Sequence, residues 1–162
     1  MNITIINYQS GNLASLKNSL ENAAKDFKRN CKIEIGDDPE KIIKADKVIL
    51  PGVGDFSNCK DQLFKINGMI EAISYFIKEK KNPFLGICIG MQLMGNISYE
   101  RKKTKGLELI NSEVVLINST NSEIRVPHMG WNTVKIENLD KSKDFPSLDN
   151  NDFYFVHSYH MK

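Results

Sequence analysis

The chain has 162 residues, of which 41% are hydrophobic and 26% charged, and its formal net charge is +2. That length allows one domain with a sizeable core, and so small a charge argues against nucleic acid as the partner. Cys31, Cys59 and Cys88 are odd in number and widely spaced. This pattern fits neither a disulfide framework nor a zinc site, so we expect a reducing, cytoplasmic location. The N-terminus carries no secretory signal pattern, and no apolar run approaches the roughly 20 residues of a membrane span.

The first half of the chain alternates between short apolar runs and amphipathic segments. Apolar runs typical of strands buried on both faces cover Asn2–Asn7, Val48–Leu50 and Phe84–Ile87, and Cys31–Ile35 alternates between apolar and polar residues as a further predicted strand. Apolar residues recur at helical spacing in the segments between them, from Leu13, around Ile42, near Asp61–Phe64 and from Met69. This alternation predicts an α/β fold, a mostly parallel open sheet with helices on both faces.

The character of the chain changes after Tyr99. Short apolar segments separated by polar turns predict a small antiparallel section near the C-terminus, with strands at Leu107–Ile110, Glu113–Ile117, Ile124–Val126, Thr133–Ile136 and Phe153–Val156. We expect Pro127–Asn132 to be a loop and Lys141–Asn151 a loop or short helix. Trp131, the only tryptophan, either faces a partner or fills a small core.

Cys88 stands between Gly86 and Gly90 at the end of a predicted strand. Leu93 and Ile97 are spaced four apart and predict a helix beyond it. Strand, sharp turn and helix with a cysteine at the turn form the thiol version of a nucleophile elbow. A helix start favours the thiolate, and the next N–H, that of Ile89, is placed to hold an oxyanion. The alternative is that Cys88 is a small buried hydrophobe at a strand end.

Two further turns follow predicted strands, at Ser10–Asn12 and at Pro51–Phe56. Because the carboxyl ends of parallel strands meet at one edge of a sheet, we expect both turns to lie near Cys88. Ligands of open α/β sheets bind at this edge. Either turn alone is also compatible with an ordinary loop between a strand and a helix.

Five motifs in this order resemble one known family. They are Asn7–Leu13, Pro51–Gly54, Gly86–Leu93, Pro127–Asn132 and Phe155–Tyr159. The set is similar to the glutaminase subunits of imidazole glycerol phosphate synthases, which are class I glutamine amidotransferases, over essentially the whole chain. The Pro-His-Met-Gly-Trp-Asn motif points to this subunit in particular. Gln9 departs from the glycine more usual in the first motif.

The resemblance implies that L-glutamine is hydrolysed to glutamate and ammonia through a thioester on the catalytic Cys88, with no cofactor or metal. It implies an oxyanion hole formed by Gly52, Val53 and Ile89, and substrate binding by Gln92, Ser158 and Tyr159. The implied partner is a cyclase subunit with a β/α barrel, which forms a heterodimer and uses the ammonia to make imidazole glycerol phosphate in histidine biosynthesis. The implied interface includes Asn12, Met129 and Trp131.

One feature of the family is missing from the sequence. The family's general base and its orienting carboxylate lie in a Phe-His-Pro-Glu-like motif near the C-terminus, whereas none of His128, His157 and His160 is followed by Pro-Glu. We therefore expect residues 1–162 to be a single, C-terminally shortened amidotransferase domain with little glutaminase activity. Other functions stay open, namely an ammonia supplier for amidine formation on surface sugars, a non-catalytic binding subunit, or a redox or hydrolytic thiol protein.

Overall fold

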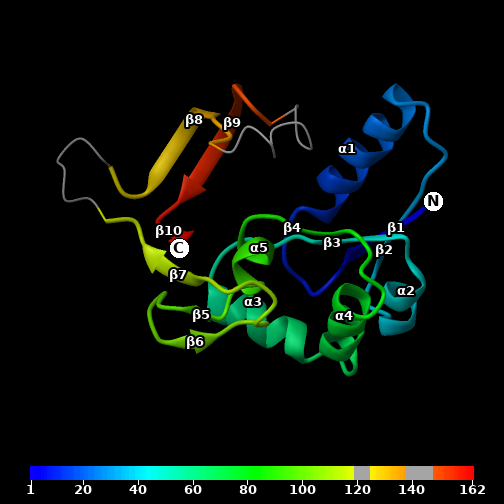
Figure 1. Ribbon diagram of the computed structural model, residues 1–162, viewed down its shortest axis with the longest axis horizontal. Coiled ribbons are helices and arrows are strands. Elements are labelled where there is room, and N and C mark those ends of the chain that lie inside the picture. Colours follow the sequence, from blue (N-terminus) through cyan, green and yellow to red (C-terminus); the bar gives the residue numbers. More distant parts are fainter. Residues whose placement is uncertain (119–124, 138–147) are drawn as a thin grey trace. The chain divides into compact units, whose positions relative to one another are not determined.

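The structure is a computed structural model (Figure 1). It describes residues 1–118, 125–137 and 148–162. The chain forms two compact units. The first comprises Met1–Val115 with Met161–Lys162, and the second comprises Leu116–His160.

A four-stranded parallel sheet is the centre of the first unit. Its strand order is β2-β1-β3-β4, with β1 at Asn2–Ile6, β2 at Lys32–Gly36, β3 at Lys47–Leu50 and β4 at Phe84–Gly86. All three strand pairings are parallel. Ile5, Ile6 and Leu50 are fully buried, as strands covered on both faces require. The predicted α/β fold with a mostly parallel open sheet is confirmed.

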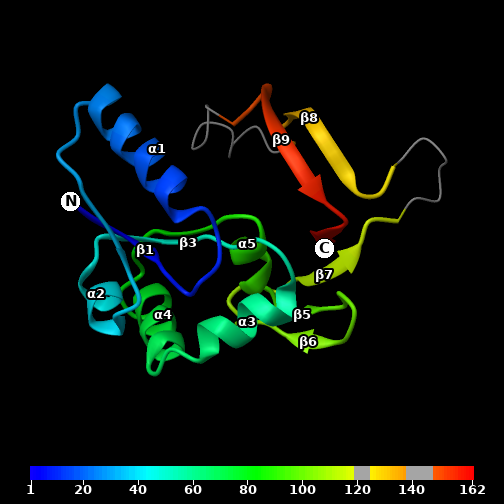
Figure 2. The same ribbon diagram turned by 180° about the vertical axis from the view of Figure 1, so that it is seen from behind.

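Helices cover both faces of this sheet. Helix α1 (Leu13–Asp26) lies on one side of the strands, and α2 (Pro39–Lys44) and α4 (Met69–Lys78) lie on the other, in both views (Figures 1 and 2). Three leucines of α1 are partly buried against the isoleucines of β1, β2 and β3. On the opposite side, the core contains residues of α2, of α3 (Phe56–Phe64) and of α4, among them Ile42, Leu63 and Phe76.

Each of the first three helices begins at a residue whose side chain caps it. The side-chain oxygens of Asn12, Asp38 and Asp55 accept hydrogen bonds from backbone N–H groups of the first turns of α1, α2 and α3, at 2.9 to 3.1 Å. Such caps satisfy donors that the helix itself leaves unpaired. The three helices begin directly after the turns that follow β1, β2 and β3.

The helix after Cys88 is shorter than predicted. Helix α5 spans only Ile89–Leu93, and Ile97 lies instead in a short strand, β5 (Ile97–Ser98). The predicted strand Leu107–Ile110 is also wrong, because this segment closes the end of α5. The N–H of Leu107 donates to the carbonyl of Leu93 at 2.8 Å, and the N–H of Ile110 donates to that of Met94 at 2.9 Å. Carbonyls at the helix end thus find partners far along the sequence.

A second sheet has the order β10-β7-β5-β6. Strand β6 spans Thr104–Lys105, β7 Glu113–Leu116 and β10 Tyr159–Met161. Strands β5 and β6 are antiparallel, but β5 and β7 are parallel. The expectation that all strands after Tyr99 pair antiparallel is therefore wrong for β7, which returns to β5 by way of the segment that closes α5.

The second unit contains a two-stranded antiparallel sheet, β8 (His128–Val134) with β9 (Asn151–His157). It confirms an antiparallel section near the C-terminus. The predicted loop Pro127–Asn132 is wrong, because all but its first residue belong to β8 and pair with β9. Of the strand predicted at Thr133–Ile136, Thr133 and Val134 form the end of β8, whereas Lys135 and Ile136 lie beyond it. The strand predicted at Ile124–Val126 and the loop or helix predicted at Lys141–Asn151 fall partly outside the described residues.

In the described ranges, no helix has the length and apolar character that crossing a membrane requires.

Candidate functional site

Cys88 occupies a strained turn between β4 and α5. Its backbone has φ 55° and ψ −118°, and its residue is exposed. A positive φ is unfavourable for a residue with a side chain and is found where the surrounding structure holds it in place. The strand, turn and helix of the predicted elbow are therefore present. The alternative of a buried cysteine at a strand end is wrong.

Two glycines beside Cys88 allow this turn to form. A Cβ atom at Gly86 would lie 2.5 Å from the Cα atom of Met91, and a Cβ at Gly90 would overlap the carbonyl oxygen of Leu50. The start of α5 therefore rests directly on the ends of β3 and β4. No other residue type fits this close approach of helix to strand.

The Gly52 loop lies against the start of the same helix. A Cβ atom at Gly52 would be 2.7 Å from the nitrogen of Gly90 and 3.0 Å from the Cβ of Ile89. The structure thus brings together Gly52 and Ile89, two of the predicted oxyanion-hole residues. Within the described part of the chain, no acceptor is found for the N–H of Ile89.

The third predicted oxyanion residue, Val53, is held by Ser10. The N–H of Val53 donates to Ser10 Oγ at 3.0 Å, and Ser10 Oγ lies 3.1 Å from the carbonyl oxygen of Val53. Cys59 Sγ stands 3.2 Å from the same Ser10 Oγ. The turns after β1 and β3 therefore meet at the edge where Cys88 lies, as the topology predicts. In this structure the amide of Val53 is used by Ser10.

Tyr8 holds the loop that contains Gly52 by a hydrogen bond, a role that the sequence did not predict. Its side chain is 1% exposed, and its hydroxyl donates to the carbonyl of Pro51 at 2.5 Å. Burial is the main cause that raises the pKa of Tyr8, and charge on Cys59 raises it further. The phenol stays protonated and keeps donating to Pro51. Its position directly after the first strand is the only sequence signal for this role.

Gln92 follows Cys88 by one helical turn on α5. Its N–H donates to the carbonyl of Cys88 at 3.1 Å, and the residue is 5% exposed. The short helix therefore fixes Gln92 relative to the thiol. Its role in binding substrate remains a prediction.

The second unit contains a chain of hydrogen bonds through two histidines. Nδ1 of His128 lies 2.8 Å from Nε2 of His157, and Nδ1 of His157 lies 2.9 Å from the carbonyl oxygen of Tyr159. Since a carbonyl only accepts, His157 donates from Nδ1 and accepts from His128 at Nε2. The amide of Asn132 stands 3.3 Å from the remaining nitrogen of His128 and completes the chain as a donor. Both histidine rings therefore form their hydrogen bonds with residues of this unit.

Ser158 and Tyr159, predicted to bind substrate through their backbones, belong to the second unit. The carbonyl of Ser158 accepts a hydrogen bond from the N–H of Ile117 at 2.8 Å. That of Tyr159 accepts from His157. Their predicted contact with glutamine remains a prediction.

One face of the β8–β9 sheet is apolar and exposed. Met129 pairs with Val156 and Trp131 with Tyr154, and all four are exposed. Trp131 is 74% exposed, so the alternative that it fills a small core is wrong. Asn12, the third predicted interface residue, is exposed and caps α1. Among the residues that the structure describes, no group of three His, Cys, Asp or Glu side chains could hold a metal ion.

Residues 10–162 match the family described as "Glutamine amidotransferase class-I". The "Imidazole glycerol phosphate synthase subunit HisH" of Pelagibacter ubique is 43% identical over 160 residues, which cover 98% of this chain and 74% of that protein. The proteins of the same name from Rhodopseudomonas palustris and Bradyrhizobium diazoefficiens are each 39% identical over 168 residues, which cover 99% of this chain and 76% of theirs.

Proposed function

Because the chain belongs to the class I glutamine amidotransferases, among the relatives of imidazole glycerol phosphate synthase subunit HisH, we propose that it is a glutaminase acting through Cys88. The observation that carries this proposal is the exposed thiol on a strained elbow, with the backbones of Gly52 and Ile89 beside it. A thiol in this position, with an N–H group next to it, suits acyl transfer.

The proposed reaction has two steps. The Cys88 thiolate attacks the side-chain amide carbon of L-glutamine, the C–S bond forms, the C–N bond breaks, and ammonia leaves after taking up a proton. Water then cleaves the thioester, which releases glutamate and regenerates the thiol. Neither step needs a cofactor.

The oxyanion of each step would be held by backbone N–H groups. The N–H of Ile89 is the first donor, and removing one such donor typically costs about 3 kcal/mol of transition-state stabilisation. The Gly52–Val53 segment would supply the second. Since the N–H of Val53 donates to Ser10 in this structure, it would have to exchange Ser10 Oγ for the oxyanion.

Gln92, together with the backbones of Ser158 and Tyr159, would hold the glutamine. A general base would assist both proton transfers, and a positioned histidine contributes about 10²- to 10⁴-fold to such steps. None of the three histidines stands in the family's Phe-His-Pro-Glu-like motif.

A cyclase subunit is the proposed partner. The relatives are named as subunits of imidazole glycerol phosphate synthase, so this chain would pass ammonia to a cyclase in histidine biosynthesis. We propose a barrel-shaped partner in a heterodimer, with Asn12, Met129 and Trp131 at the interface. The names of the relatives do not favour the alternative of an ammonia supplier for sugar amidines.

A diazoketone analogue of glutamine tests the proposal, because it alkylates a glutaminase nucleophile without requiring turnover. We expect mass spectrometry to find the label on Cys88, and L-glutamine to slow the labelling. Cys31→Ser is the matched control and should label like the parent chain. Label on Cys31 or Cys59 in place of Cys88, or labelling that glutamine does not slow, would overturn the proposal.

A further inference from the structure

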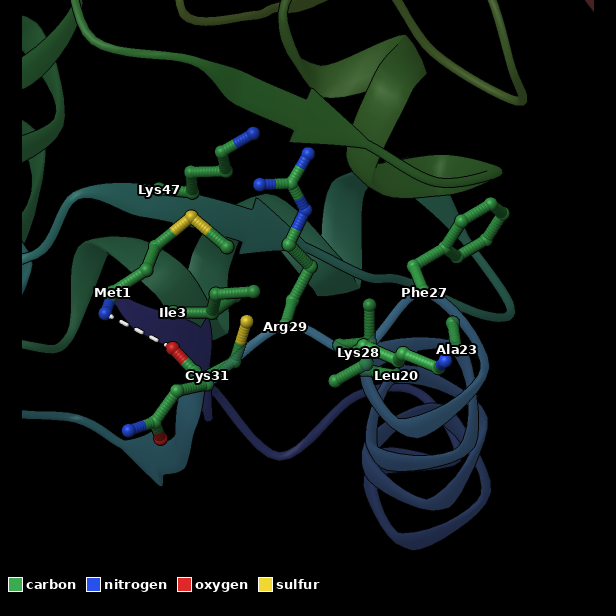
Figure 3. A pocket seen from close by; sticks show the side chains of 11 residues that line it. Met1, Ile3, Leu20, Ala23, Phe27, Lys28, Arg29, Cys31 and Lys47 are labelled. Carbon is green, nitrogen blue, oxygen red and sulfur yellow. Dashed lines mark hydrogen bonds between the residues drawn. The ribbon is translucent and has the colours of Figure 1, made fainter.

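A hollow of about 800 Å³ opens at the edge of the parallel sheet opposite Cys88 (Figure 3). It is lined by residues at the starts of β1 and β3, at the C-terminal end of α1, and just before β2. Its volume falls in the range of small-molecule sites. The proposed glutaminase reaction does not use this part of the molecule.

The floor of the hollow is apolar. Ile3 is 9% exposed and belongs to the core cluster of the sheet, against which Leu20 of α1 is packed. Ala23 and Ala24 continue this surface along α1. Small side chains at these two positions leave space between helix and strand.

The rim of the hollow is cationic. Lys28, Arg29 and Lys47 line it, and no Asp or Glu is among its lining residues. None of these three cations forms an ion pair with any residue that the structure describes. The neighbouring carboxylate of Asp46 accepts a hydrogen bond from the N–H of Asn2 at 2.7 Å. Figure 3 shows the head groups of Arg29 and Lys47 directed to the same side.

Favourable interaction with the helix dipole explains the positions of only some of these cations. Lys28 and Arg29 follow the last turn of α1, where cations are stabilised by the partial negative charge of the helix end. Lys47 is the first residue of β3, and no helix end explains it. Three unpaired cations around one apolar floor form a pattern that suits an anion with an apolar body.

We propose that this hollow binds a small amphipathic anion, an apolar ring or short chain that carries a phosphate or a carboxylate group. Arg29 and Lys47 would hold the anionic group by charge-assisted hydrogen bonds. Ile3, Leu20 and Ala23 would contact the apolar body. The site goes beyond the proposed function, because it needs neither Cys88 nor glutamine.

Calorimetric titration of the chain with phenyl phosphate tests the proposal. We expect a Kd below about 1 mM. Inorganic phosphate, which has only the anionic group, and benzyl alcohol, which has only the apolar ring, should bind much more weakly. Benzoate in a parallel titration tells whether phosphate or carboxylate is preferred. Arg29→Gln combined with Lys47→Gln should weaken binding at least roughly tenfold. The matched control is Lys102→Gln combined with Lys103→Gln, which removes the same charge elsewhere and should bind like the parent chain.

Cys31 reports where the ligand binds, since it lines the hollow and is partly exposed. Phenyl phosphate should slow alkylation of Cys31 by N-ethylmaleimide and leave alkylation of Cys88 unchanged. The proposal fails if neither phenyl phosphate nor benzoate binds at roughly 10 mM. It also fails if inorganic phosphate binds equally well, if both double variants lose the same affinity, or if Cys31 is not protected. A failed glutamine reaction at Cys88 would leave these results unaffected.

Discussion

Gln9 holds its backbone in the left-handed region, with φ 62°, in the turn that carries Ser10. This conformation costs a residue with a side chain about 1–2 kcal/mol. Gln9→Gly removes that cost but gives the unfolded chain more freedom, which offsets about 0.4–1 kcal/mol. We expect a net gain of about 0.5–1 kcal/mol in the free energy of unfolding, measured by urea denaturation.

The control for Gln9 is Asn18→Gly on the exposed face of α1. A glycine in ordinary helical backbone should lower the free energy of unfolding by about 0.5–1 kcal/mol. A loss of stability in both variants would show that the turn does not strain Gln9. The same result would mean that the positive φ does not explain why the family more usually has glycine at this position of the motif Asn7–Leu13.

Tyr8 gives the fold a dependence on alkaline pH. Burial raises the pKa of Tyr8 in the folded chain above the ordinary tyrosine value of about 10. The unfolded chain therefore loses this proton first, so the stabilisation is complete below about pH 10 and declines as pH rises through the folded pKa. The urea midpoint of the parent chain should fall more between about pH 9 and pH 11 than that of Tyr8→Phe. Parallel curves for both chains would contradict the buried, protonated phenol.

At neutral pH the same variant tests the support of the Gly52 loop. Tyr8→Phe removes the hydrogen bond to the carbonyl of Pro51, and we expect a loss of about 1 kcal/mol in the free energy of unfolding. An unchanged stability at pH 7 would mean that this bond contributes nothing to holding the loop.

At the scale of elements, the elbow depends on how closely α5 approaches β3. Gly90→Ala would place a methyl group on the carbonyl of Leu50, so the helix start must shift. We expect a loss of roughly 1–3 kcal/mol in the free energy of unfolding, together with slower diazoketone labelling of Cys88. Gly36→Ala is the matched control, because its Cβ has Lys41 as its nearest neighbour at 3.9 Å. Equal stability of the two variants would contradict the close packing.

The elements that were predicted correctly are those with a recognisable pattern within a few consecutive residues. Three of the four parallel strands lie in mainly apolar runs, β2 alternates between apolar and charged residues, and Cys88 stands between two glycines where a run ends. Local patterns could not show that Leu107–Ile110 closes the end of α5, because the partners of those N–H groups lie 13 to 16 residues earlier. Strand β8 was missed because Pro127, Gly130 and Asn132 are typical of loops, although Met129 and Trp131 alternate with other residues as in a strand. Its pairing with β9 is a long-range contact.

In the candidate site, too, features with a local sequence signal were predicted and long-range contacts were not. Sequence motifs pointed to Cys88, Gly52 and Ile89, and the structure brings these backbones together. The hydrogen bond from Val53 to Ser10 and the support from Tyr8 join residues more than 40 positions apart. Such contacts depend on the order of the strands in the sheet, which no single motif contains.

At the scale of the whole molecule, the apolar face of β8 and β9 predicts a partner surface. Trp131→Ala removes the largest exposed side chain of this face, and an aromatic anchor often contributes about 2 kcal/mol or more to binding. We expect weaker binding to a cyclase subunit by calorimetry and an unchanged melting temperature. Tyr75→Ala, an exposed aromatic on α4, is the control and should bind normally. A lower melting temperature with unchanged binding would show that Trp131 stabilises the fold instead.

In the proposed reaction, Cys88 forms a covalent bond with the side-chain acyl group of glutamine. The most direct measurement is acid quenching of the chain with L-glutamine, followed by peptide mass spectrometry. We expect a γ-glutamyl thioester on the Cys88 peptide, present in Cys31→Ser and absent in Cys88→Ser. Ammonia release from glutamine that persists in Cys88→Ser, or a thioester on another cysteine, would show that Cys88 is not the nucleophile.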